Sequence, residues 1–351
     1  MATSITATGH VRLFDFTKEM FSRAGMDEEG AATCADCLVQ TNLWGIDSHG
    51  VLRVPIYIKR LLSGAMNKAP DIKSLKDAGA LEVIDGDDGC GYVVGRAAMA
   101  RAIEKAEQFS IGAVGAIRSN HFGAAALYTR MAAEKGMIGV AMTNVVPNMV
   151  VPGGSKPIVG NNPLAISVPT FGDFPFTLDI SMSAVAGGKL LLASKKGEKI
   201  PLDWATDKDG RPTDDPDKGF AGFLLPLGGH KGYGLALAVD LLSGVLTGGA
   251  FLHDLRGLYK HSDEPSRSGH FFMVINPLAL MGEADFKARM ADFYSQIKGS
   301  PMWDESAEML MPGEIEYRND LKRREEGIVL PPDLVTELNV LAAELGMGQR
   351  L

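Results

Sequence analysis

The sequence predicts an α/β (α+β) protein, with a run of alternating strands and helices between two mainly helical ends. Residues 12–62 place Leu, Phe, Val and Met at helical spacing between polar positions. From residue 80 short apolar or β-branched runs alternate with longer Ala-rich runs, and after residue 282 the helical spacing returns. These observations favour a sheet built from the middle of the chain, with helices at both ends.

The middle of the chain divides into distinct elements. Residues 80–144 predict a βαβαβ unit, read from "ALEVID", "GRAAMARAIEKAEQFS", "IGAVGAIRS", "GAAALYTRMAAEKG" and "MIGVAMTN". "NPLAISVPT" and "PFTLDIS" predict short strands, and a polar loop follows at 205–219. "HKGYGLALAVDLLSGVLTGG" predicts a buried helix and "HFFMVINP" a further strand. The helical ends, 1–75 and 283–351, are expected to form one lobe beside a sheet domain of residues 76–282.

Composition and charge exclude several classes of protein. The chain has 351 residues, 46% of them hydrophobic, which is enough for substantial cores. The formal net charge is −8 and the Lys and Arg residues are scattered, so no nucleic-acid partner is expected. Without a signal peptide or an apolar span, the sequence predicts a cytoplasmic protein with a small-molecule partner and no membrane partner. The three cysteines fit a reducing compartment, and Cys34 and Cys37 are interpreted as buried thiols rather than metal ligands.

A glycine-rich stretch, "GDDGCGYVVGRAAM", follows a predicted strand and opens a predicted helix. Gly89, Gly91 and Gly95 imitate a dinucleotide-binding fingerprint, but their spacing is G-x-G-x-x-x-G. The second strand ends in Arg118 and Ser119, where the ribose-binding acidic residue would stand. A tight turn whose glycines let a helix lie close to the sheet explains the pattern equally well.

Two further segments place polar residues before small-residue helices. In "RSNHFGAAALYTRM", the helix start beside His121 can bind an anion, and the imidazole can donate a hydrogen bond or exchange a proton. In "LGGHKGYGLALAVDLL", the glycines allow close approach of a ligand, and Lys231 supplies a cation for a phosphate or ribose. The alternative interpretations are an N-cap with a satisfied histidine in the first segment and helix packing in the second.

The most reactive pattern is "DSHGVLR". If this segment is helical, His49 and Arg53 lie four residues apart on one face. The pair suits a 2-oxo or 2-hydroxy acid, because the arginine fork can hold the carboxylate while the imidazole exchanges a proton with the neighbouring oxygen. Ser48 or Asp47 can fix the second ring nitrogen. Alternatively, Asp47 and Ser48 are N-caps and Pro55 prevents a shared helical face.

Seven motifs together resemble one family. "DSHGVLRVP", "RSNHFG", "GNNPLAISVP", "LDISMSAVAGGK", "WATDKDGRPTDDP", "GGHKGYGLAL" and "MPGE" occur in the order found in the malate/L-lactate dehydrogenase family of the non-Rossmann type. That family includes ureidoglycolate dehydrogenase, sulfolactate dehydrogenase, diketogulonate reductase and the piperideine-2-carboxylate reductases. The resemblance runs from about residue 10 to 345.

The resemblance implies an NAD(P)-binding sheet domain with a mixed, largely antiparallel sheet flanked by helices, and a homodimer or higher homo-oligomer. It implies NAD or NADP as cofactor, with NAD slightly favoured. By the same resemblance the proton donor falls on His49, assisted by Ser48, or on His121 as in some members, and the carboxylate anchor on Arg53. The cofactor-binding positions implied are His121, Phe122, Gly123, Ala124, Asp179, Ile180, Ser181, Lys231, Gly313 and Glu314.

Departures from the family pattern bear on the substrate. Asn161 stands where relatives commonly have a threonine near the substrate, so it is a predicted substrate-binding residue. Gly187 and Lys189 occupy positions where the cyclic ketimine reductases have an arginine and an aspartate. The sequence therefore favours an NAD(P)-dependent dehydrogenase of a small 2-hydroxy carboxylate such as malate, lactate or sulfolactate. The alternatives are a reductase of cyclic or N-alkyl 2-imino acids and an inactive nucleotide-binding sensor.

Overall fold

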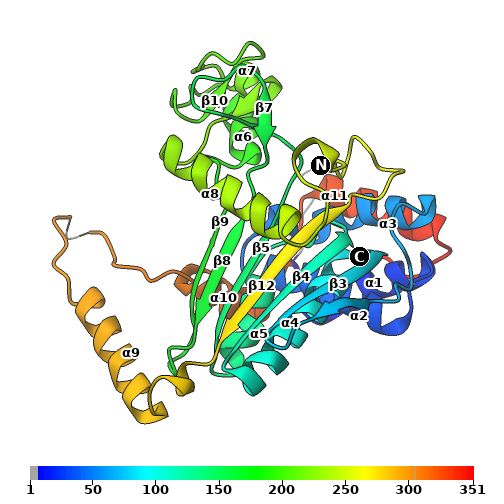
Figure 1. Cartoon of the computed structure of the whole chain (residues 1–351). Helices are drawn as coiled ribbons and strands as arrows, with labels where there is room; N and C mark the ends of the chain where they lie inside the picture. Colours follow the sequence, from blue (N-terminus) through cyan, green and yellow to red (C-terminus); the bar gives the residue numbers. More distant parts are fainter. Residues whose placement is uncertain (1–6, 305) are drawn as a thin grey trace.

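The computed structural model describes residues 7–304 and 306–351, and its centre is a seven-stranded sheet (Figure 1). The strand order is β2-β3-β4-β12-β5-β8-β9. The strands are β2 (Lys73–Asp77), β3 (Leu81–Gly89), β4 (Ile111–Ser119), β12 (Ser268–Ile275), β5 (Ile138–Thr143), β8 (Leu164–Val168) and β9 (Phe176–Ile180). The strands predicted from the middle of the chain are all present, because alternation of side chains between two faces is local information.

Pairing within this sheet is mixed and largely antiparallel, which confirms the fold expected from the family resemblance. β3 and β4 are parallel, whereas β12 lies antiparallel between β4 and β5. The strands of the predicted βαβαβ unit are therefore not all neighbours, as they are in a Rossmann unit. The helices and strands of that unit are correct, and its Rossmann interpretation is wrong.

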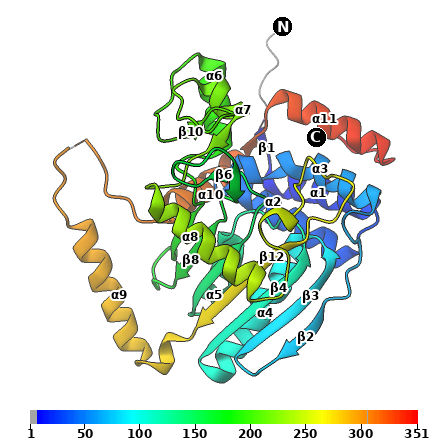
Figure 2. The same ribbon diagram turned by 45° about the horizontal axis from the view of Figure 1, so that its top comes forward.

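Helices cover both faces of the sheet (Figure 2). α4 (Gly91–Phe109) and α5 (Ala126–Glu134) lie on one face. α8 (His230–Asp240) and the π-helical turn η3 (Leu241–Val245) lie on the other. The register of β4 agrees with this arrangement of helices. A side chain at Gly112 would touch α4, whereas one at Gly115 would touch Thr247, and these two positions point to opposite faces of the sheet.

The helix predicted at 230–249 is only partly buried. Leu235, Leu241 and Leu246 are 47%, 56% and 63% exposed, so the prediction of a buried helix is wrong for one side of this element. The apolar residues of this segment surround the helix, but the sheet covers only one side of it.

The two ends of the chain lie beside each other. The N-terminal helices are α1 (His10–Arg23), α2 (Glu28–Leu43) and α3 (Val54–Ser63), and the last two helices are α10 (Glu314–Glu326) and α11 (Pro332–Glu344). α10 packs on α2 and α11 on α3, and β1 (Ala7–Thr8) pairs with β13 (Ile328–Val329). The short η5 (Pro277–Ala279) leads into α9 (Glu283–Lys298), which extends away from this group (Figure 1). The division into domains at residues 75–76 and 282–283 stays a prediction.

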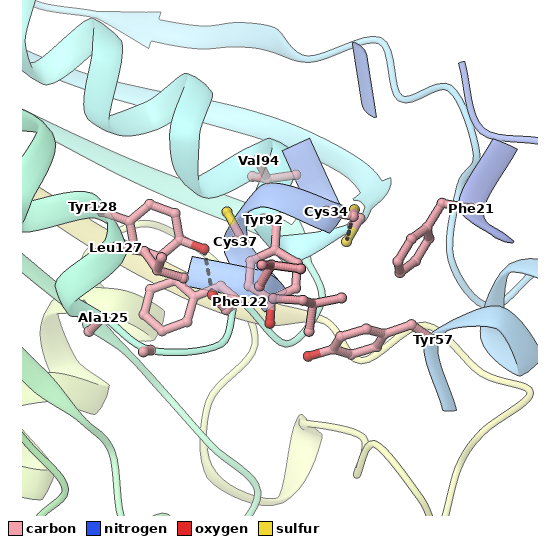
Figure 3. Packing of buried hydrophobic residues seen from close by; sticks show 14 of the residues in the cluster. Phe21, Cys34, Cys37, Tyr57, Tyr92, Val94, Phe122, Ala125, Leu127 and Tyr128 are labelled. Atoms are coloured by element: carbon pink, nitrogen blue, oxygen red, sulfur yellow. Dashed lines mark hydrogen bonds between the residues drawn. The ribbon is translucent and has the colours of Figure 1, made fainter. Parts of the chain in front are cut away.

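One hydrophobic core joins the N-terminal helices to α4 and α5. Figure 3 shows Tyr57 of α3 and Tyr92 of α4 beside Phe122, whose carbonyl accepts a hydrogen bond of 2.5 Å from Tyr128. The rings of Tyr57 and Tyr92 meet edge to face, with centroids 5.8 Å apart. This packing fixes α3 against the loop that follows β4.

A second, smaller sheet lies beyond the end of the main one. Its order is β10-β11-β6-β7, and α6 and α7 pack beside it (Figure 1). The elements are β10 (Ala205–Thr206), β11 (Phe223–Leu224), β6 (Met149–Val150), β7 (Pro157–Val159), α6 (Gly187–Lys196) and α7 (Pro216–Ala221). The sequence pattern does not predict this sheet, because its strands are too short for a period of two to be recognised.

The register brings several loops to one end of the main sheet. The end of β4 pairs with the start of β12, and the end of β5 with the start of β8. The start of β8 pairs in turn with the end of β9. The segments after β4, β5 and β9 and before β8 and β12 therefore meet at the same end of the sheet. Within the described residues, no helix is long and apolar enough to cross a membrane.

Candidate active site

The "DSHG" segment forms two short 3₁₀ turns rather than one α-helix. η1 (Asp47–His49) and η2 (Val51–Arg53) are separated by the extended backbone of Gly50. A side chain at Gly50 would stand 2.2 Å from Asn42, so only glycine fits there. Pro55 lies in the first turn of α3 (Val54–Ser63), where proline is tolerated. It therefore stands at the start of a helix and does not interrupt one.

Both ends of the chain hold this turn in place. Asn42 of α2 accepts a hydrogen bond from the Val51 N–H (2.8 Å) and donates one to Asp47 (2.6 Å). Arg323 of α10 donates to both carboxylate oxygens of Asp47, at 2.6 and 3.0 Å. The contacts of Asp47 therefore support the turn and do not include the ring of His49.

Ser48, His49 and Arg53 form a connected group. The Ser48 hydroxyl lies 2.9 Å from His49 Nδ1, and Arg53 Nε donates to the Ser48 carbonyl at 2.8 Å. A second guanidinium nitrogen of Arg53 donates to the hydroxyl of Tyr259. The centre of the Tyr259 ring lies 5.5 Å from the guanidinium carbon. A guanidinium has five N–H groups, so three remain for a bound carboxylate.

His121 lies directly beside His49. The two imidazole rings are stacked, with centroids 5.6 Å apart and planes inclined by 24°. The hydroxyl of the buried Tyr57 lies 2.6 Å from His121 Nδ1. In both histidines Nδ1 therefore has a hydroxyl partner, which leaves each Nε2 for a ligand.

Burial and neighbouring charge favour the neutral form of both rings. Burial, followed by the charge of Arg53, lowers the pKa of His49 to about 4. Burial lowers the pKa of His121 well below its ordinary value, with further contributions from His49 and Arg53. A carboxylate bound to Arg53 would offset that positive charge and so favour protonation of the pair.

The turn after β4 has unsatisfied backbone donors. Phe122, Gly123 and Ala124 are buried, and the N–H groups from His121 to Ala124 have no acceptor within the described residues. Gly123 has φ +75°, and a side chain there would lie 2.4 Å from Tyr92. Buried backbone N–H groups are rarely left unpaired. The turn therefore fits a polar ligand such as the carboxamide or ribose of a nicotinamide cofactor.

Asp179 already occupies the start of α5. Its carboxylate accepts a hydrogen bond of 2.8 Å from the Ala126 N–H. Burial raises the pKa of Asp179 to about 6, although the hydrogen bond from Ala126 favours its charged form. A phosphate at this helix start would meet a carboxylate, so the anion-binding interpretation of the segment does not fit there.

Three other predicted site residues, Asn161, Ser181 and Lys231, lie on segments that Met182 connects by backbone hydrogen bonds. The Met182 N–H donates to the Asn161 carbonyl at 2.9 Å, and the Met182 carbonyl accepts from Leu227 at 2.9 Å. Met182, the residue after Ser181, therefore joins the segment of Asn161 to the loop that leads to Lys231. Lys231 is exposed and forms no salt bridge with the rest of the described chain. This loop opens α8 with glycines at positive φ, and the position of a side chain at Gly229 is open space.

Gly313 and Glu314 lie at the start of α10, away from the end of the sheet where the other predicted residues meet. Gly313 packs against Thr177 near the start of β9, about 10 Å along the strand from its end at Ile180. Glu314 is buried and accepts hydrogen bonds from Lys298 (2.6 Å) and Arg318 (2.5 Å). Burial alone would raise the pKa of Glu314, but these hydrogen bonds keep it below its ordinary value. Their predicted cofactor role stays a prediction, beside an evident role in holding α9, α10 and β9 together.

Sequence reasoning missed two residues that the site uses. Tyr57 falls within the helical spacing of residues 12–62, and its separation of eight residues from His49 carries no functional signal. His270 on β12 bonds Thr143 of β5 at 2.7 Å and Ser119 of β4 at 2.8 Å, and it stacks on Phe122 with centroids 4.6 Å apart. The contacts of His270 depend on strand pairing, and that of Tyr57 depends on the packing of α3 against the loop after β4, so neither residue's role is visible along the chain.

His270 makes stability depend on pH. Burial lowers its pKa to about 3, so below pH 6.5 the unfolded chain binds a proton that the folded chain does not. Stability is therefore lost as pH falls, by about 2 kcal/mol between pH 7 and pH 5 from this group alone. Denaturant unfolding at both pH values should show a shallower pH dependence for His270→Gln than for the wild type. Equal slopes would assign the acid sensitivity to other groups.

The glycine-rich stretch that imitates a dinucleotide-binding fingerprint also has a structural explanation. A side chain at Gly91 would lie 2.3 Å from the carbonyl of Asn120, and one at Gly95 would lie 2.6 Å from Tyr128. These glycines let α4 lie against the loop after β4 and against α5. The packing interpretation of the motif is therefore supported.

Comparison with known proteins now identifies the family. The family model described as malate/L-lactate dehydrogenase matches residues 1–339. The chain belongs to this family. It is 41% identical to L-sulfolactate dehydrogenase of Methanocaldococcus jannaschii over 330 residues, 94% of each chain. It is 40% identical to malate dehydrogenase of Pyrococcus abyssi over 343 residues, 95% of this chain and 94% of the relative.

Solved structures of the family have the same fold. The sulfolactate dehydrogenase of Methanocaldococcus jannaschii superposes with a TM-score of 0.92 at 39% identity, covering 97% of this chain and 98% of that one. The Δ1-piperideine-2-carboxylate reductase of Pseudomonas syringae pv. tomato is more distant, with a TM-score of 0.86 at 28% identity over 96% of this chain and 100% of that one. The prediction of a 2-hydroxy acid dehydrogenase is confirmed, and this family implies a nicotinamide cofactor.

Proposed function

We propose that the protein transfers hydride reversibly between NAD and C2 of a small 2-hydroxy or 2-oxo carboxylate, with Arg53 binding the carboxylate and the His49–His121 pair handling the proton. The observation that carries this proposal is the stacked imidazole pair beside a guanidinium with three N–H groups available. A 2-hydroxy acid places its carboxylate next to its C2 oxygen. An arginine fork and an adjacent imidazole match this arrangement.

Within the pair, His121 is the proton-transferring group and His49 donates a hydrogen bond to the same oxygen. Tyr57 supports this assignment, because its buried hydroxyl pairs with Nδ1 and so leaves Nε2 to take up or release the proton. The corresponding partner of His49 is the exposed Ser48, which holds its ring less rigidly. The geometry thus favours His121, the alternative of the sequence prediction, over its first choice.

When bound, the nicotinamide supplies or accepts the hydride. The unpaired N–H groups of the turn from His121 to Ala124 would hold its polar groups, and Ser181 and Lys231 would bind further along it. Arg118 gives no support for NADP, because its guanidinium already binds Asp85 (2.8 Å) and Asp88 (2.9 Å). Its charge is therefore compensated within the protein.

The substrate class follows from the relatives and from the residues of this chain. Relatives with 40% and 41% identity are named for malate and L-sulfolactate. Gly187 and Lys189 depart from the ketimine-reductase pattern, and the named ketimine reductase is a more distant structural neighbour. These observations favour a hydroxy acid over a cyclic imine.

A panel of substrates tests the function. Pyruvate, oxaloacetate, sulfopyruvate and piperideine-2-carboxylate are each supplied with NADH and then with NADPH, and nicotinamide absorbance is followed. We expect turnover of at least one 2-oxo acid, faster with NADH. Turnover of piperideine-2-carboxylate alone would show that the reaction is C=N reduction. Cofactor binding without any oxidation would indicate a nucleotide-binding sensor.

The proposal includes assembly as a homodimer or higher homo-oligomer in the cytoplasm. Leu235, Leu241 and Val245 are exposed apolar residues of α8 and η3, and such clustered apolar exposure favours a contact surface. The free cysteines Cys34, Cys37 and Cys90 are buried thiols, as a reducing compartment allows. Light scattering coupled to size-exclusion chromatography should give at least twice the chain mass of 37.4 kDa.

A further inference from the structure

Tyr259 stands beside the proposed carboxylate anchor, on a segment that the sequence analysis left unassigned. It lies between η4 (Leu252–Asp254) and the start of β12, and Figure 2 shows this segment running beside α3. Tyr259 is 61% exposed, yet its hydroxyl accepts a hydrogen bond from Arg53 and its ring lies 5.5 Å from the guanidinium carbon. An exposed loop residue is thus in direct contact with a predicted substrate-binding group.

A buried arginine fixes the segment that carries Tyr259. The guanidinium of Arg60 donates to the carbonyls of His261 and Glu264, both at 2.7 Å, and to the Ser266 hydroxyl at 2.9 Å. Arg60 is fully buried and forms no salt bridge with the described residues. Burial of a cation without a carboxylate is unfavourable unless hydrogen bonds satisfy it. Here they satisfy the two terminal nitrogens of Arg60, while Nε has no partner among the described residues. These hydrogen bonds hold an irregular segment in one conformation.

The guanidinium of Arg60 also contacts the loop after β4, which carries His121. Arg60 also donates to the side-chain oxygen of Asn120 at 2.9 Å, and Asn120 immediately precedes His121. Asn120 is fully buried and donates in turn to the carbonyls of Asp88 and Gly89. The position of Tyr259 is therefore coupled to that of His121 through one rigid network.

The Tyr259 hydroxyl keeps its own hydrogen for a ligand. As the acceptor from Arg53, the oxygen uses a lone pair, and within the described chain its hydrogen has no protein acceptor. A carboxylate that lies against the free N–H groups of Arg53 would be next to this O–H donor. Hydrogen bonds to a charged acceptor are stronger than those between neutral groups.

We infer that Tyr259 is a further substrate-binding residue, which donates its hydroxyl hydrogen to the carboxylate of the 2-oxo or 2-hydroxy acid held by Arg53. This inference rests on the proposed function. Its ring also restricts the guanidinium to one orientation, so that the carboxylate meets a preorganised pair of donors from different segments of the chain.

The test is Tyr259→Phe, which keeps the ring and removes the donor. We expect the KM of the best 2-oxo acid to rise about tenfold to hundredfold, with kcat within about threefold of wild type. Binding of NADH, measured by fluorescence, should not change. Tyr294→Phe on the distant α9 removes a hydroxyl that has no partner in the described residues and should leave KM and kcat unchanged.

A double-mutant cycle with Arg53→Lys checks that the two residues bind the same group. If they do, Tyr259→Phe raises KM less in the Arg53→Lys background than in the wild type. An unchanged KM in Tyr259→Phe, with an active wild-type enzyme, would overturn this inference and leave the proposed function intact. Loss of NADH binding together with kcat would also overturn it, because it would indicate a role in folding. Failure of the wild type on every 2-oxo acid would instead refute the proposed function.

Discussion

Replacing His121 by asparagine is expected to lower kcat for the 2-oxo acid by about 10² to 10⁴, the usual contribution of a positioned general acid or base. The reason is the position of its Nε2, which Tyr57 leaves free by bonding Nδ1 at 2.6 Å. Steady-state kinetics in both directions measures the loss. Fluorescence titration with NADH establishes separately whether the cofactor still binds.

His49→Asn is the matched comparison for this variant. Because asparagine can still donate a hydrogen bond, we expect kcat to fall only about tenfold at position 49. Tyr57→Phe should also lower kcat about tenfold, since it removes the group that orients His121 and leaves its ring in place. If His49→Asn is the more damaging change, the proton transfer belongs to His49, as the sequence first suggested, and Tyr57→Phe should then have little effect.

Replacing Arg53 by lysine is expected to raise the KM of the 2-oxo acid roughly tenfold to hundredfold, because a hydrogen bond to a charged group contributes about 1.5–3 kcal/mol and a single ammonium cannot replace a fork. Arg53→Ala should have a larger effect, since it leaves the carboxylate without a cation. The same change also removes the charge that lowers the pKa of His49. The pKa of His49 should therefore be higher in Arg53→Ala than in the wild type, as an NMR titration of the imidazole can show.

The carboxylate is the group on which this prediction depends. An unchanged KM in both Arg53 variants would refute the assignment of the anchor. Arg256, which bonds Glu264 and lies on the same segment as Tyr259, offers a matched control for the exchange of a guanidinium for an ammonium. Arg256→Lys should leave the KM of the substrate unchanged.

Much of the local structure was predictable because its cause is local. The alternation in "IGAVGAIRS" and the helical spacing in "GRAAMARAIEKAEQFS" correspond to β4 and α4. The placement of β12 between β4 and β5 was not predictable from these patterns, because β12 follows β5 by more than a hundred residues. Only the resemblance to a family indicated an antiparallel sheet, and the strand register confirms it.

The sequence by itself determined the family, the class of reaction and the residue types of the site, including His49, Arg53 and His121. It could not determine how these residues meet. Their arrangement depends on contacts between distant segments, with Arg323 holding the turn of His49 and Tyr57 orienting His121. Tyr259 reaches Arg53 only because the buried Arg60 fixes its loop. Such contacts are decided by the packing of the whole chain, since hydrogen-bond partners 64 to 276 residues apart leave no periodic signal in the sequence.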